Sequence, residues 1–129
     1  MPITYQIDHE RNLVIFEAHG ILKDPEYREI RARIASDPQF RPGMKQLEDF
    51  RSVEKHDFTT EGYDLFLDQE ILLRPFFGNT RHAIVTKSDL HFGLTRKLIA
   101  EIGDSHQYVQ VFRSMDEAEV WLFSEDEAE

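Results

Sequence analysis

The chain has 129 residues, of which 40% are hydrophobic, and a formal net charge of −10 from 25 acidic and 15 basic residues. This length is close to the commonest domain size and predicts one domain over residues 1–123. The acidic balance argues against nucleic acid as a partner, because such proteins must neutralise phosphates. Residues 124–129, which carry four acidic side chains, are expected to form a solvated acidic tail.

The chain contains no cysteine, which excludes disulfides, thiolate metal sites and cysteine nucleophiles. No apolar run approaches the ~20 residues that a membrane helix needs, so we expect no membrane insertion. The N-terminal residues lack the basic and apolar regions of a secretory signal. We therefore expect a cytoplasmic protein.

The N-terminal part of the chain has the pattern of two paired strands. Alternating apolar and polar residues predict a strand over residues 3–7, and a nearly continuous apolar run predicts a second strand over 13–18. The short connection between them predicts an antiparallel hairpin.

A helix is predicted next, with Asp24 as its N-cap and Pro25 at its first position, where a missing N–H costs nothing. Asp37 and Pro38 end it. A turn at residues 41–43 then leads to a predicted strand over 45–50.

Thr59 or Thr60 is expected to cap a second helix, which continues towards Arg74 and Pro75. A turn is predicted over residues 76–79. A buried strand over 82–87 follows it.

A third helix is predicted with Asp89 as its cap and Gly103 just after its C-terminus. The last strand is expected over residues 108–112. Ser114 begins the capping box of a final helix, since Glu117 follows it by three residues. The predicted order is β-β-α-β-α-β-α-β-α, which gives an α/β fold with a five-stranded, mostly parallel central sheet and helices packed on it.

Three stretches resemble a known family of small bacterial domains. They are residues 47–62, where a strand with acidic residues leads to a capped helix, then residues 83–96 and 111–122. Together they resemble STAS domains, and in particular SpoIIAA-like proteins. This resemblance implies the same α/β fold over most of the chain. SpoIIAA-like proteins are also similar in fold to lipid-binding SEC14 domains, which implies an apolar ligand by analogy.

STAS domains of the anti-anti-sigma type are switched by phosphorylation of a serine at the start of the second helix. The resemblance places Phe58 at the matching position, with Thr59 beside it. Phenylalanine cannot be phosphorylated, so we expect no such switch unless Thr59 or Thr60 takes the place of that serine.

The sequence carries no motif that predicts a cofactor or a metal. Its six histidines include no HExxH, no H-x-H and no i, i+4 pair, and neither a P-loop nor a G-x-G-x-x-G segment occurs. His56 and Asp57 could supply two ligands of a metal site, but two adjacent residues rarely complete such a site by themselves. We expect scattered surface or capping histidines, no metal and no cofactor.

Two classes of function remain. The first is a non-catalytic regulatory or ligand-binding module that contacts a protein partner or a small apolar molecule through the second and third helices, with a homodimer as a further possibility. The second is a small hydrolase or isomerase with dispersed histidines and carboxylates at the strand ends. A deep pocket that holds two of Asp49, His56 and His91 would favour this enzyme.

The expected binding surface consists of polar residues at the strand ends and of aromatic residues on the second and third helices. Its members are Asp49, Arg51, Tyr63, Phe66, Phe76, Phe77, Thr86, Asp89, Phe92, Gly93 and Arg96. Gly93 within a helix indicates close backbone approach. Arg96 either binds the ligand or pairs with Glu48 or Asp49, two carboxylates that should point to opposite faces of their strand.

Overall fold

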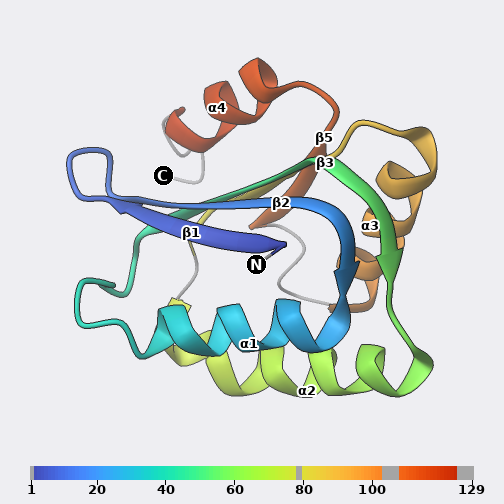
Figure 1. The fold of residues 1–129 in the computed structure, drawn as a ribbon. Coiled ribbons are helices and arrows are strands. Elements are labelled where there is room, and N and C mark those ends of the chain that lie inside the picture. Colours follow the sequence, from blue (N-terminus) through green and yellow to red (C-terminus); the bar gives the residue numbers. More distant parts are fainter. Residues whose placement is uncertain (1, 78–79, 103–107, 125–129) are drawn as a thin grey trace.

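The computed structural model describes residues 2–77, 80–102 and 108–124 (Figure 1). In these residues the elements follow the order β1 (Ile3–Asp8), β2 (Leu13–Lys23), α1 (Asp24–Ala35), β3 (Lys45–Asp57), α2 (Thr60–Phe77), β4 (His82–Val85), α3 (Asp89–Ile102), β5 (Val109–Phe112) and α4 (Met115–Phe123). The predicted order and the α/β fold are therefore confirmed. Some predicted features lie outside the described residues. They are the turn residues Gly78 and Asn79, Gly103 after the third helix, and tail residues 125–129.

The strands form one sheet in the order β1-β2-β3-β4-β5. The β1–β2 pair is antiparallel, as expected for a hairpin, and the other three pairs are parallel. β2 and β3 run on past their predicted ends and stay paired up to Lys23 and Asp57. Gly20 lies within the extended part of β2, where it takes a φ of +68° at a register shift in the ladder.

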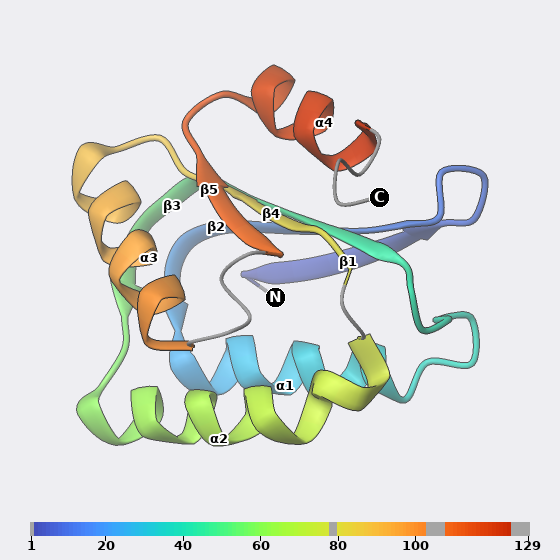
Figure 2. The same ribbon diagram turned by 180° about the vertical axis from the view of Figure 1, so that it is seen from behind.

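Strand alternation divides the core between the two faces of the sheet. Val14 and Phe16 face α1, α2 and α3, whereas Leu13 and Leu47 face α4. Figures 1 and 2 show α1 and α2 side by side below the sheet and α4 alone above it. The larger core thus lies between the sheet and three helices. Among the described residues, no helix combines the length and apolarity needed to cross a membrane.

Two predicted helix starts are wrong by one residue. Lys23, not Asp24, occupies the N-cap of α1, because the Asp24 carboxylate bonds to Arg28 and to Thr59 at the start of α2. Ser88, not Asp89, caps α3, since its hydroxyl accepts a hydrogen bond from the His91 N–H at 3.1 Å. The expected cap of α4 is confirmed, with Ser114 accepting from the backbone N–H three residues later.

α2 continues through Pro75 to Phe77, although the sequence predicted its end near this proline. Tertiary packing accounts for the extra turn, because Phe77 is buried and packs edge-on against Phe40 with ring centroids 5.6 Å apart. Burial of this ring offsets the backbone hydrogen bond that Pro75 cannot donate.

A buried charged cluster joins α1, α2 and β3. The guanidinium of Arg31, 2% exposed, contacts the Glu70 carboxylate of α2 and lies 3.8 Å from the Glu48 carboxylate of β3. It also lies over the rings of Tyr27, Phe66 and Phe77, at 5.2–5.6 Å from their centroids. Arg31 therefore connects the two helices to the sheet through both charge and stacking.

Glu48, which is fully buried, is the second centre of this cluster. It accepts hydrogen bonds from the Tyr27 hydroxyl at 2.8 and 3.0 Å, and its Oε2 lies 2.5 Å from Nε2 of His82. Burial opposes ionisation of Glu48, but His82, Arg31 and the hydrogen bonds outweigh it and hold its pKa below the usual value.

Candidate functional site

A pocket of about 400 Å³ lies between α2 and α3, next to the end of β3. Its apolar walls come from Phe58, Tyr63, Leu94 and Leu98. Its polar lining comes from His56, Thr59, Thr60, His91, Thr95, Lys97 and Glu101. The pocket exists because β3 extends to Asp57, beyond the end of the neighbouring strand β4, and so carries His56 and Phe58 to the helices. We call it the α2–α3 pocket.

Two histidines, 35 positions apart in the sequence, meet in the α2–α3 pocket. The rings of His56 and His91 are 4.4 Å apart between centroids, in an edge-on contact with 67° between their planes. Burial, and then the nearby His91, lower the pKa of His56 to about 4, whereas Glu48 acts in the opposite direction. His56 is therefore neutral at pH 7. Its Nε2 is buried and has no hydrogen-bond partner among the described residues.

The start of α2 forms one end of the pocket. The Thr59 hydroxyl accepts a hydrogen bond from the Gly62 N–H at 2.9 Å, which identifies Thr59 rather than Thr60 as the N-cap. The Thr59 N–H donates to Asp24 Oδ2 at 2.9 Å, and its hydroxyl lies 3.3 Å from the same oxygen. Both functions of the Thr59 hydroxyl are thus used within the fold.

Asp24 also explains the glycine in the first turn of α2. A Cβ at Gly62 would lie 2.1–2.3 Å from the Asp24 carboxyl atoms, closer than any real contact. Arg28 closes the junction, bonding to Asp24 Oδ1 at 2.7 Å and to the Gly62 carbonyl at 3.1 Å. α1 and α2 are therefore held in close contact at this end.

Among the described residues, one side-chain hydrogen bond connects α3, the opposite wall of the pocket, to α2. The Tyr63 hydroxyl donates to Glu101 Oε2 of α3 at 2.8 Å. Burial, followed by this bond, raises the pKa of Tyr63 to about 12, so the hydroxyl keeps its proton. Lys97 and Glu101 carry opposite charges, and they are the charged side chains that line the pocket in the described part of the chain.

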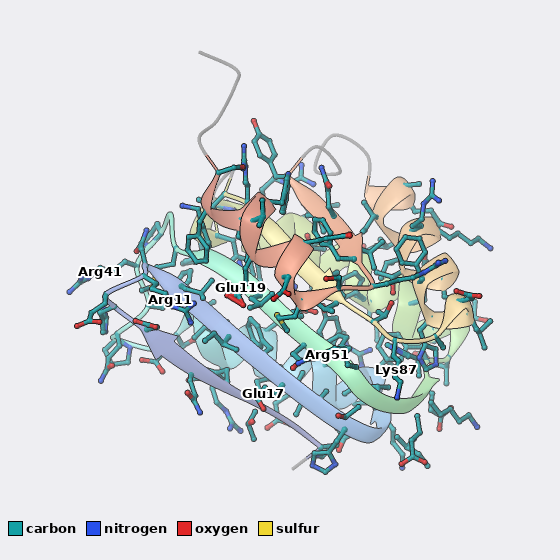
Figure 3. All side chains as sticks on the ribbon, turned by 90° about the horizontal axis from the view of Figure 1, so that it is seen from above. Arg11, Glu17, Arg41, Arg51, Lys87 and Glu119 are labelled. Carbon is teal, nitrogen blue, oxygen red and sulfur yellow. The ribbon has the colours of Figure 1, made fainter. Side chains whose placement is uncertain are left out.

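Asp49 and Arg51 belong to the opposite face of the sheet. Glu48 points to α1, so Asp49, its neighbour on the strand, points towards the side of α4, as predicted. Arg51 Nε bonds to Asp49 Oδ1 at 2.8 Å, and Figure 3 shows Arg51 near Glu17 on the open sheet beside α4. The pocket thus holds His56 and His91, which are two of the three residues named in the enzyme hypothesis, while Asp49 lies on the other face of the sheet.

The aromatic residues expected at the site have different environments. Tyr63 lines the pocket, whereas Phe66 and Phe77 belong to the core beside Arg31. Phe76 is 49% exposed, whereas its neighbour Phe77 is buried. One residue of this group therefore lines the pocket.

The α3 residues expected at the site lie outside the α2–α3 pocket. Arg96 lies over the Phe92 ring at 5.8 Å, and Arg113 stacks on that ring at 4.3 Å. The predicted pairing of Arg96 with Glu48 or Asp49 is wrong, because those carboxylates bind other partners. Phe92 and Arg96 instead line a smaller pocket of about 270 Å³ between α3 and β5.

Three further predicted residues are placed apart from the pocket. Asp89 is exposed and pairs with Arg113 at 3.1 Å. Gly93 is exposed, and a Cβ at this position would meet no described atom of another element within 4 Å, so the expected close backbone approach is wrong. Thr86 is fully buried at the end of β4, and its hydroxyl has no partner among the described residues.

From the sequence we expected His56 and His91 in the enzyme hypothesis and His56 also in an incomplete metal site, and we did not identify Phe58, Leu94 or Leu98 as site residues. The spacing of Leu94 and Leu98 by four positions was a signal, since it places both on one face of α3. Nothing local indicated that β3 would reach residue 57. In the described residues, no group of three or more side chains is arranged to hold a metal ion.

Comparisons with known proteins identify the fold. No family model matches the chain, and no curated protein matches it. An uncharacterised DUF3478 protein with a SpoIIAA-like fold from Shewanella loihica PV-4 is similar over 93% of each chain, with a TM-score of 0.64 and 18% identity. The anti-sigma factor antagonist SpoIIAA, in its unphosphorylated form, is similar over 92% of this chain and 94% of its own, with a TM-score of 0.54 and 17% identity. The chain therefore has a SpoIIAA/STAS-like fold, as its sequence indicated.

Proposed function

We propose that this SpoIIAA-like domain is a non-catalytic binding module whose ligand, a small and mostly apolar molecule, occupies the α2–α3 pocket. The observation that carries the proposal is the pocket itself. Its volume of about 400 Å³ lies in the range of small-molecule sites, and apolar and aromatic side chains line it together with a few polar groups. Burial of apolar ligand surface against these walls would supply the affinity.

A regulatory role is the second part of the proposal. SpoIIAA, whose fold the chain shares, is an anti-sigma factor antagonist. Several large apolar side chains on α2 and α3 are exposed and available to a protein partner. They are Leu65, Ile71, Leu72, Phe76, Leu90 and Leu94. Leu94 also lines the pocket, so a bound ligand would alter the surface that a partner meets.

A small hydrolase or isomerase is the second candidate, and the His56–His91 contact favours it. A neutral His56 has the protonation state of a general base. The described residues nevertheless offer it no carboxylate to orient it, because Asp49 lies on the other face of the sheet and Glu101 bonds to Tyr63. The binding module accounts for the site with fewer assumptions.

Nuclear magnetic resonance with naphthol as the probe tests the proposed site. We expect chemical-shift changes at the Leu94 and Leu98 methyl groups, and none at Leu122, which is buried under α4. The variant Leu98→Trp should fill the pocket and remove binding. Leu90→Trp, a matched change at an exposed position of α3 outside the pocket, should leave binding intact. Equal affinity of both variants would contradict the proposal.

A further inference from the structure

We infer that the ligand of the α2–α3 pocket is an uncharged, flat, mostly apolar molecule with one hydroxyl or carbonyl group, which hydrogen-bonds to Nε2 of His56. This inference rests on the proposed function, because it names the chemistry of the molecule that would occupy the same pocket. It depends on three properties of the described lining residues, which are an unpartnered nitrogen, the balance of charge and the arrangement of rings.

The first property is the unpartnered nitrogen. Five buried side-chain atoms have no hydrogen-bond partner among the described residues. One is Nε2 of His56, and the other four belong to Arg31, Gln46, Gln69 and Thr86. Of the five, only His56 Nε2 belongs to a residue that lines the α2–α3 pocket, and a turn of the imidazole ring would bring this buried atom to the pocket surface. A buried polar atom without a partner costs free energy that a suitable ligand atom would recover. A hydroxyl meets this need with either histidine tautomer, and a carbonyl meets it with one.

The second property is the charge around that nitrogen. His91 faces His56 from α3, and Lys97, the one lysine or arginine that lines the pocket in the described chain, is accompanied by the opposite charge of Glu101. The Glu48 carboxylate acts on His56 from the core, and burial keeps His56 neutral at pH 7. An anionic head group would lose its water here without gaining a cation in return. The net charge of −10 adds to the repulsion of anions.

The third property is the arrangement of rings. Phe58 and Tyr63 line the pocket together with the two imidazoles, and the His56 ring also lies 5.9 Å from that of Phe58. Aromatic rings in offset or edge-on contact gain stability beyond the area they bury. A planar ring system therefore fits this lining better than a flexible chain, which would lose more conformational freedom on binding.

Three probes with one carbon skeleton separate these contributions, namely naphthalene, naphthol and naphthoate. Calorimetric titration at neutral pH should give naphthol an affinity three- to tenfold above that of naphthalene, as one net hydrogen bond provides. Naphthoate should bind at least tenfold more weakly than naphthol. The nitrogen resonance of His56 Nε2 should shift with naphthol and stay unchanged with naphthalene, which tests the contact in the unmodified protein.

His56→Phe keeps a ring and removes the nitrogen, so it should abolish the preference for naphthol over naphthalene. His9→Phe, the same change at an exposed turn, should preserve this preference. Naphthoate binding as tightly as naphthol, or a preference that survives His56→Phe, would overturn the inference and leave the proposed pocket intact. Binding of none of the three probes would overturn both.

Discussion

Replacement of Arg31 by methionine tests the buried charged cluster most directly. Arg31→Met removes a guanidinium that is 2% exposed and leaves the carboxylates of Glu48 and Glu70 without it. Loss of one member of a buried ion pair costs ~3–5 kcal/mol, because the remaining charge stays desolvated. Methionine refills much of the apolar volume, so the cavity contribution is small. Since domains have a total stability of roughly 5–15 kcal/mol, this is a large fraction.

Urea denaturation followed by circular dichroism measures the effect. We expect the midpoint of Arg31→Met to fall by roughly 1–5 M, given an m-value of about 1–3 kcal/mol per molar for small proteins. Arg33→Met is the matched control on the same helix, since Arg33 pairs with Glu29 at 3.1 Å and the two side chains are 52% and 62% exposed. This exposed pair should contribute about 0.5 kcal/mol or less.

The dependence on pH provides a second check. The pKa of Glu48 is lowered in the folded protein, so its contribution to stability is present above the unfolded pKa and is lost as pH falls through the folded value. Arg31→Met removes one cause of that lowering, and its stability deficit should shrink at acid pH. Equal midpoints for Arg31→Met and Arg33→Met at neutral pH would refute the reasoning.

Three further predictions concern the residues around the pocket. Gly62→Ala should destabilise the fold by at least about 1 kcal/mol in thermal unfolding, because its Cβ would clash with Asp24. Gly93→Ala, with open space around it, should instead add about 0.5–1 kcal/mol of stability. The opposite order would contradict the geometry. Thr59→Ala should cost ~1 kcal/mol through loss of the cap, and mass spectrometry of protein from native cells should find no stoichiometric phosphate on Thr59, whose hydroxyl is already occupied by the fold. The stability of the unmodified protein should fall as pH drops from about 6.5 to about 4, because His56 binds a proton in the unfolded chain but not in the folded one. The full pKa shift corresponds to ~3 kcal/mol of stability, and partial exposure of the ring reduces this to about 1–2 kcal/mol. His56→Phe should lose this part of the pH dependence, and unchanged melts at pH 7 and pH 5 in the original chain would rule it out.

The fold could be predicted because its signals are local. Alternating apolar residues in β1 and the capping box at Ser114 specify their elements within a few positions. The wrong boundaries occur where distant residues intervene. The sequence pattern predicts Asp24 as the N-cap of α1, yet its carboxylate bonds to Thr59, 35 positions away. Phe77 likewise extends α2 because of the distant Phe40.

The site was harder to predict because three elements build it. His56 and His91 carry no spacing motif, and they meet only because β3 extends past the end of β4. The exposed and core positions of Phe76 and Phe66 depend on how α2 is rotated against α1, which the sequence pattern leaves undefined. The alternation of side chains along β3 predicts that Asp49 and Glu48 lie on opposite faces of the sheet. This difference of face separates Asp49 from Arg96.

The two walls of the α2–α3 pocket are held with different strength, and this difference suggests how binding would be transmitted. α2 is connected to α1 by the Asp24–Thr59 and Arg31–Glu70 contacts. In the part of the chain that is described, the polar connection from α2 to α3 is the Tyr63–Glu101 hydrogen bond. A molecule between the helices would add apolar contact across this weaker junction and stabilise the arrangement that binds it. Ligand occupancy would therefore act mainly on the position of α3, the helix that carries the exposed Leu90 and Leu94.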